Sequence, residues 1–180
     1  MTNAFDTAIF SAVHGFAGAS RLLDAVGIFL AEYLAYVLLL AVVVFLWKEQ
    51  RWQRRFYVIF LAGLAMIFSR GVMTELIWRL YDRPRPFVAL AFEPLIAKIA
   101  SPSFPSGHAA MFFALATVLF FVRRRWGIWF FVLTVLMGYA RVLVGVHWPS
   151  DVFAGAVVGI AGGVAAHALL PKPREAESGG

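Results

Sequence analysis

The sequence contains no cysteine and few charged residues. Of its 180 residues, 14% are charged and 62% are hydrophobic, whereas soluble domains average about 25% charged and about 45–50% apolar residues. The missing cysteine excludes disulfides, iron–sulfur clusters and cysteine-ligated zinc. The abundance of apolar residues excludes a disordered chain, and it excludes a soluble fold because a chain this short cannot bury so much apolar surface. The composition predicts one compact domain embedded in lipid.

Acidic side chains are scarcer than basic ones, with 10 Asp and Glu against 16 Lys and Arg and a net charge of +6. Nucleic acid is not an expected partner, because no basic run is interleaved with aromatic residues that could stack on bases. Basic residues that flank membrane spans and meet anionic lipid head groups explain the excess. We expect membrane lipids as surroundings, and no obligatory protein partner is evident.

Apolar segments of about 20 residues, the length of a bilayer-spanning helix, occur five times. They lie at residues 24–47, 56–81, 106–122, 126–144 and 151–170. Before them, apolar residues recur at helical spacing in residues 1–20, which are too short and interrupted to span. The predicted fold is therefore all-α: a polytopic membrane helix bundle of five to six helices, the N-terminal one interfacial. We expect residues 1–170 to form a single domain and residues 171–180 a polar, disordered tail.

Basic residues in the short loops predict the orientation of the bundle. Nine of them fall on one side if five spans alternate: Lys48, Arg51, Arg54, Arg55, Arg123, Arg124, Arg125, Lys172 and Arg174. That side should be the cytoplasm, so loops 82–105 and 145–150 face outward. In the fifth span, Gly155, Gly159 and Gly163 predict close packing within the bundle. The sequence has no internal repeat, so it does not support an inverted-repeat transporter.

Polar residues at membrane depth indicate function, and the first group of them ends the second span. Pro84 and Pro86 stop the helix, while Arg79 and Arg85 carry forked donors that match phosphate oxygens. An ordinary helix-terminating basic loop has the same composition, so this group alone decides nothing. Upstream, Arg70 and Glu75 are expected to form an ion pair; alternatively, Glu75 positions Arg79.

The second group opens the third span. Ser106 is a good helix cap, and the N–H groups of the first helical turn have no partners within the helix. Gly107 lets a ligand approach this positive helix end, which favours anions. His108, in the same turn, could donate a proton to a leaving oxygen. The alternative is a plain helix cap beside an interfacial histidine.

The third group joins spans four and five. Asp151 follows His147 by four residues, so one helical turn would bring the two together. A carboxylate on one imidazole nitrogen leaves the other free to attack, and Arg141 adds another phosphate donor. The alternative is a helix-start acid that satisfies backbone N–H groups beside an unrelated histidine.

The three groups together match the requirements of phosphoryl transfer: donors around the phosphoryl oxygens, an in-line nucleophile and an acid for the leaving group. No acidic cluster suited to magnesium occurs, so arginines would supply the positive charge and no cofactor or metal is expected. A zinc hydrolase that uses both histidines and the aspartate is a weaker alternative, because the arginines would repel the cation.

The same residues resemble the signature of the type 2 phosphatidic acid phosphatase superfamily, which reads Lys-x6-Arg-Pro, Pro-Ser-Gly-His and Ser-Arg-x5-His-x3-Asp. The matching segments are Arg85-Pro86, Pro105–His108 and Arg141–Asp151. Two positions depart from it: Trp78, beside Arg79, stands at the lysine, and Ala140 stands at the serine before the arginine. The match extends over residues 78–151.

The resemblance implies a lipid phosphatase that works without metal. His147 would attack phosphorus and form a phosphohistidine, and Asp151 would orient it. His108 would protonate the departing oxygen and then activate water. The phosphate would be held by Arg85, Ser106, the Gly107 N–H, Arg141 and Arg79.

The short chain and the Arg-Pro-Arg-Pro-Phe sequence are also similar to bacterial undecaprenyl diphosphate phosphatases. This similarity implies a cell-wall enzyme of the bacterial plasma (inner) membrane, with its site on the extracytoplasmic side, that converts undecaprenyl diphosphate to undecaprenyl phosphate. Phosphatidylglycerol phosphate, phosphatidic acid and lipid A phosphate remain alternative substrates. A channel or transporter for anionic lipids is the alternative of another class.

Overall fold

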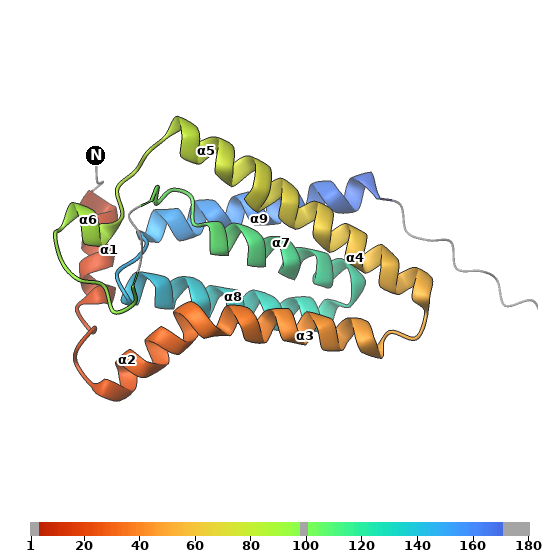
Figure 1. Cartoon of the computed structure of the whole chain (residues 1–180), viewed down its shortest axis with the longest axis horizontal. Coiled ribbons are helices and arrows are strands. Elements are labelled where there is room, and N and C mark those ends of the chain that lie inside the picture. Colours follow the sequence, from red (N-terminus) through yellow and green to blue (C-terminus); the bar gives the residue numbers. More distant parts are fainter. Residues whose placement is uncertain (1–3, 98–100, 171–180) are drawn as a thin grey trace, which may run out of the picture.

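The computed structural model describes residues 4–97 and 101–170; the predicted tail 171–180 lies outside the described residues. All regular elements in the described ranges are helical (Figure 1). Two of them, η1 and η2, are π-helical. The elements are α1 (Ala4–His14), α2 (Arg21–Ile28), η1 (Phe29–Tyr33), α3 (Leu34–Lys48), α4 (Trp52–Met66), η2 (Ile67–Thr74), α5 (Glu75–Leu80), α6 (Pro86–Ala89), α7 (Gly107–Val122), α8 (Arg124–Leu143) and α9 (Pro149–Leu169).

Five long helical segments form the bundle, as predicted. Elements α2–η1–α3 make one continuous segment and α4–η2–α5 another. In the described part of the chain, these two together with α8 and α9 are long and apolar enough to cross a membrane. The 16-residue α7 is shorter and occupies the middle of the bundle, where most of its side chains are buried. The predicted multi-pass, all-helical membrane fold is therefore confirmed.

The glycines of α9 let it lie directly against α7. A Cβ at Gly155 would stand 2.5 Å from the carbonyl oxygen of Ser106, and one at Gly159 would stand 2.5 Å from that of Ala110. At Gly163 the nearest atom would be the Thr117 Cβ, at 2.6 Å. The spaced glycines thus pack within this chain, as predicted, and they set the close separation between α7 and α9.

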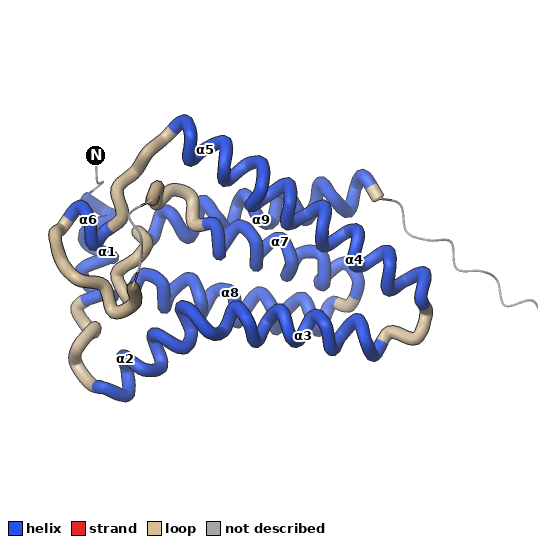
Figure 2. Tube along the Cα trace, viewed as in Figure 1, coloured by secondary structure: helices blue, strands red, loops and turns tan. Residues whose placement is uncertain are grey.

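The two ends of the bundle differ in chemistry. The α3–α4 and α7–α8 connections lie at one end, together with the end of α9 (Figure 2). There the buried Glu49 carboxylate pairs with Arg54 at 3.7 Å and with Arg123 at 3.8 Å. The opposite end carries the α5–α6–α7 and α8–α9 connections and the short helix α1 (Figures 1 and 2).

Helix α1 is part of this second end. It packs against α8 and α9, and its Phe10 ring is buried 5.1 Å from the ring of Trp148. His14 Nδ1 lies 2.7 Å from the carbonyl oxygen of Leu143. The predicted N-terminal helix therefore exists and contacts the loop between spans four and five.

Candidate active site

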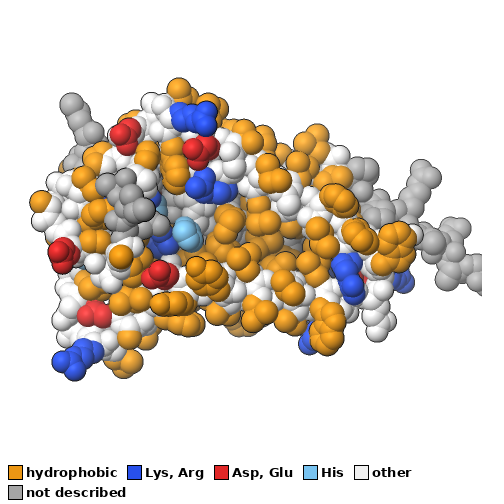
Figure 3. Space-filling view, viewed as in Figure 1, with side chains coloured by type: hydrophobic (Ala, Val, Ile, Leu, Met, Phe, Trp, Pro, Cys, Tyr) orange, Lys and Arg blue, Asp and Glu red, His pale blue; other side chains and the backbone are white. Residues whose placement is uncertain are grey.

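The three polar groups that the sequence singled out meet at one end of the bundle. They come from the α5–α6 connection, the start of α7 and the α8–α9 connection, which lie next to one another (Figure 1). In the space-filling view, basic and histidine side chains surround a hollow on this end, and a separate basic group marks the other end (Figure 3).

His147 and Asp151 form the centre of the site. Both are buried, and His147 Nδ1 lies 3.5 Å from Asp151 Oδ2. They come together because Pro149 starts α9 between them, which places Asp151 in the first turn. A carboxylate beside Nδ1 favours the tautomer with its proton on Nδ1 and a lone pair on Nε2.

Asp151 is itself held by several donors. Its Oδ2 accepts hydrogen bonds from the Ser103 hydroxyl and from the Trp148 N–H, the latter at 2.8 Å. Its Oδ1 accepts one from Arg83 Nη1 at 2.7 Å. Its carbonyl oxygen accepts the Ser106 N–H at 2.9 Å, so the backbone links the starts of α9 and α7. These bonds fix the carboxylate that faces His147.

Arg85 places a positive charge at the other side of the imidazole. Its Nη1 lies 3.2 Å from His147 Nε2 and donates to the Val146 carbonyl at 2.9 Å. Its remaining donors bind Ser101 and the Pro102 carbonyl. Burial lowers the pKa of Arg85, and the negative charge of Asp151 partly offsets this lowering. The guanidinium nevertheless stays charged at neutral pH, because an arginine pKa starts so high.

Arg141 lies in the last turn of α8 and is 2% exposed. It donates from Nη1 to the Ala31 carbonyl at 2.8 Å, within the π-helical segment η1. Its Nε is buried and has no hydrogen-bond partner among the described residues. The charge of Arg141 interacts with those of Arg85 and Glu32. Two neighbouring guanidinium groups favour an anion between them.

The start of α7 forms the third wall. Ser106 is the N-cap, and its side chain accepts the Ala109 N–H at 3.5 Å. Gly107 and His108 follow in the first turn, with Gly107 buried and His108 half-buried. The N–H groups of the first turn and the dipole of α7 thus add positive potential to the end that carries His147.

Arg70 lies at this helix start. A Cβ on Gly107 would stand 2.6 Å from Arg70 Nε, so the absence of a side chain at Gly107 makes room for this arginine. Arg70 pairs with Glu75 at 3.4 Å and stacks on Trp78 at 4.4 Å. The expected Arg70–Glu75 ion pair is present, and it joins Glu75 to Arg70 rather than to the exposed Arg79.

The site contains an ion pair that the sequence does not predict, although one of its members, Arg83, belongs to the first polar group. Asp6 of α1 and Arg83 are both buried and form an ion pair at 2.5 Å. Arg83 also donates to Ser150 Oγ at 2.7 Å. Burial raises the pKa of Asp6, but hydrogen bonds from Arg83 and Ser150 outweigh it and hold the pKa below its ordinary value. Asp6 interrupts an apolar stretch, which is the signal that could have identified it.

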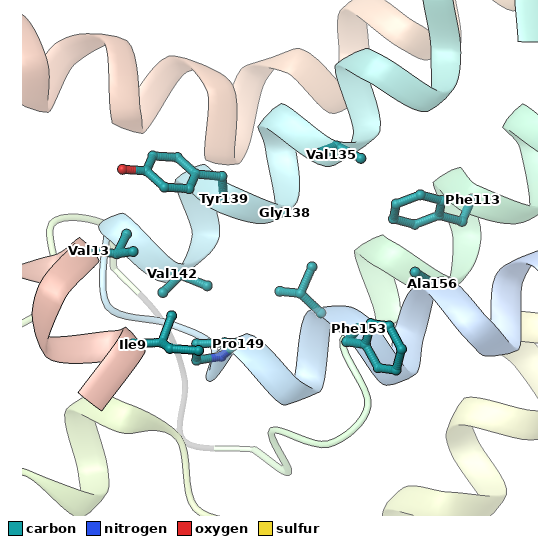
Figure 4. A pocket seen from close by; sticks show the side chains of 11 residues that line it. Ile9, Val13, Phe113, Val135, Gly138, Tyr139, Val142, Pro149, Phe153 and Ala156 are labelled. Atoms are coloured by element: carbon teal, nitrogen blue, oxygen red, sulfur yellow. The ribbon is translucent and has the colours of Figure 1, made fainter. Parts of the chain in front are cut away.

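An apolar groove of about 310 Å³ lies between α1, α8 and α9 (Figure 4). Val13, Tyr139, Val142 and Phe153 are among its lining residues. The groove offers almost no polar surface, so it suits hydrocarbon rather than phosphate. A zinc hydrolase would require three His, Asp or Glu side chains grouped around one metal ion. Within residues 4–97 and 101–170, no such group occurs.

Comparison with known proteins identifies the family. The model of the PAP2 superfamily matches residues 56–175, two thirds of the chain and all three polar groups. The chain belongs to the PAP2 superfamily. This PAP2 protein is therefore a multi-pass membrane phosphatase, a hydrolase.

Relatives of this PAP2 protein include undecaprenyl-diphosphatase BcrC of Bacillus subtilis, which is 36% identical over 84% of this chain and 77% of the relative. Lipid A 1-phosphatase of Rhizobium etli is 36% identical over 53% of this chain and 43% of the relative. Among solved structures, Aquifex aeolicus LpxE aligns with a TM-score of 0.75 and 30% identity, covering 91% of this chain and 95% of that one.

Proposed function

We propose that this PAP2 protein removes a phosphate from an isoprenoid diphosphate through a phosphohistidine intermediate on His147. The favoured substrate is undecaprenyl diphosphate. The observation that carries the mechanism is the placement of the imidazole. Its Nδ1 faces Asp151 at 3.5 Å, and its Nε2 lies 3.2 Å from Arg85 Nη1. The nucleophilic lone pair thus points at a group suited to holding a phosphoryl oxygen.

The first half-reaction proceeds at His147 Nε2. When a phosphoryl oxygen takes the Arg85 donor, Nε2 is released to attack phosphorus, and the bond to the leaving oxygen breaks. Asp151 stabilises the positive charge that develops on the ring. His108, half-buried at the start of α7, protonates the leaving oxygen.

In the second half-reaction, water attacks the phosphohistidine. His108, now neutral, takes a proton from that water, and the N–P bond breaks to release phosphate and regenerate Nε2. Arginines supply the positive charge that metal ions supply in many phosphoryl-transfer enzymes, so no metal is needed.

The phosphate oxygens are held by residues from all three walls. Arg85 and Arg141 supply guanidinium donors, and Ser106 and the Gly107 N–H supply the helix start. The sequence predicts Arg79 as the fifth phosphate-binding residue, because it is next to Trp78, which stands at the lysine of the family signature. Arg70 is better placed, because it packs on Gly107 and is still about one-third exposed.

Undecaprenyl diphosphate is the preferred substrate because the relative BcrC, which aligns with most of this chain, carries that name. The apolar groove and the surrounding bilayer suit a long hydrocarbon chain. Lipid A is the second candidate, supported by the names of the Rhizobium relatives over about half of this chain. Phosphatidylglycerol phosphate and phosphatidic acid are the remaining alternative substrates.

The location we propose is the bacterial plasma membrane, with the site on the extracytoplasmic side and a role in cell-wall (peptidoglycan) synthesis. Basic residues gather in and directly beside the α3–α4 and α7–α8 connections. The positive-inside rule assigns that end to the cytoplasm, and the site lies at the other end.

The test is phosphate release by purified protein in detergent, with each candidate lipid and with EDTA present. We expect release from undecaprenyl diphosphate that is insensitive to EDTA and lost in His147→Ala. His167→Ala is the matched control, because His167 stacks on Phe121 at 4.1 Å and contacts Tyr57, away from the site. Full activity of His147→Ala refutes the mechanism. Lipid flux without phosphate release would instead indicate the transporter.

A further inference from the structure

The buried Arg83 joins two carboxylates from opposite ends of the sequence. Its Nη2 lies 2.5 Å from Asp6 Oδ2, and its Nη1 lies 2.7 Å from Asp151 Oδ1. The side chains of all three residues are at most 6% exposed. A single guanidinium therefore connects α1 to the carboxylate that faces His147.

Further contacts hold the Asp6 end of this connection. Asp6 Oδ1 accepts the Ser150 N–H at 2.9 Å, and the Ser150 hydroxyl bonds to Asp6 Oδ2 and accepts from Arg83. Helix α1 is held in addition by the Phe10 ring against Trp148. Asp6 thus lies in a fixed position beside the first turn of α9.

The charges in this chain have a consequence for the reaction. Asp151 alone with Arg83 would be a neutral pair, with little negative charge left for an imidazolium on His147. Asp6 supplies a second negative charge, so Asp6, Arg83 and Asp151 together carry −1. Buried ion pairs of this kind are costly to break, because removing one partner leaves an uncompensated charge.

We propose that Asp6 is a positioning residue of the catalytic centre: through Arg83 it holds Asp151 and preserves the negative charge that faces His147. Helix α1 is accordingly a component of the active site and not only a membrane-surface element. The inference rests on the proposed function, in which His147 is the nucleophile.

The test compares Asp6→Asn with Asp24→Asn in the full-length protein. Asp24 is the matched control, because its half-buried carboxylate also accepts a backbone N–H near the N-terminus, from Gly18 at 2.9 Å, in a solvent-exposed hydrogen bond. We expect Asp6→Asn to lower kcat about 10- to 100-fold, the effect typical of losing a residue that orients a functional histidine. KM should stay within about twofold, since Asp6 does not touch the phosphate-binding groups.

A second measurement does not need activity. The ¹⁵N NMR signals of the histidine rings, assigned with His147→Ala, report which nitrogen of His147 carries the proton. We expect Asp6→Asn to reduce the Nδ1–H form of His147, and Asp24→Asn to leave it unchanged. If the wild type releases no phosphate from any lipid, the proposed function fails and this NMR result alone decides the role of Asp6.

The proposal is overturned if folded Asp6→Asn keeps kcat within twofold and an unchanged His147 signal, or if Asp24→Asn loses as much of each. Where Asp6→Asn does not fold, Ser150→Ala takes its place, since it removes the hydroxyl that bonds to Asp6 and accepts from Arg83. Its expected loss in kcat is about 3- to 10-fold, the effect of one hydrogen bond, with the same two overturning results.

Discussion

The contact between α9 and α7 leads to a quantitative prediction for Gly155→Ala. The added Cβ would stand 2.5 Å from the Ser106 carbonyl oxygen and 2.7 Å from the Ala109 Cβ. Backbone cannot rotate away as a side chain can. To reach an acceptable separation, α7 must move by about 0.5 to 0.9 Å relative to α9.

That movement separates the two halves of the site. Ser106 and His108 move with α7, while Asp151 stays with α9. A displacement near 1 Å costs about 100-fold in rate when catalytic groups are aligned, so we expect kcat to fall 10- to 100-fold. Overpacking of a well-packed core also costs about 1–3 kcal/mol of stability.

The assay pairs phosphate release with thermal unfolding in detergent. Gly63→Ala is the matched control, because Gly63 also lies in a membrane helix but a Cβ there meets nothing within 4 Å. It should keep wild-type activity and gain slightly in stability, since alanine favours a helix over glycine. Wild-type kcat and melting temperature in Gly155→Ala would refute the proposed coupling between helix spacing and catalysis.

Three further predictions follow from the site. Arg70→Gln should raise KM and lower kcat/KM about 10-fold or more, while Arg79→Gln should stay within about threefold, as measured by phosphate release; the reverse order would assign the phosphate to Arg79. His108→Gln should release phosphate about 100-fold more slowly or worse, because the acid of the first half-reaction and the base of the second are both lost; wild-type phosphate release by this variant contradicts both roles. The lowered pKa of Asp6 means that its charge stabilises the fold above the ordinary value of 3.8 and that this contribution is lost as pH falls through the lowered pKa. The melting temperature should therefore drop more steeply below about pH 4 in the wild type than in Asp6→Asn, and parallel curves would contradict this.

The fold was predictable because each span is a long apolar run bounded by charge or proline. The predicted spans 24–47 and 56–81 became helical segments Arg21–Lys48 and Trp52–Leu80. Polar residues at the ends of the spans then marked the site, since lipid tolerates few of them without a function. The close packing of α9 on α7 followed from the spacing of small residues.

The contacts among distant residues were not predictable. Asp6 and Arg83 are separated by 77 positions, and no periodicity relates them. Arg70 is two helical turns before Arg79, and only the π-helical segment η2 and the bare Gly107 show how it approaches α7. Pairings of this kind depend on how helices pack, which hydrophobic patterns do not specify.

The shortness of α7 bears on how a substrate is reached. At 1.5 Å per residue, its 16 residues extend about 24 Å, less than the roughly 30 Å of a hydrocarbon core. If the end at Arg123 lies at the membrane surface and the helix stands upright, the opposite end would lie about 6 Å below the level of the lipid head groups. In the function proposed above, a phosphorylated lipid would then enter the site sideways, with its chain remaining in the bilayer.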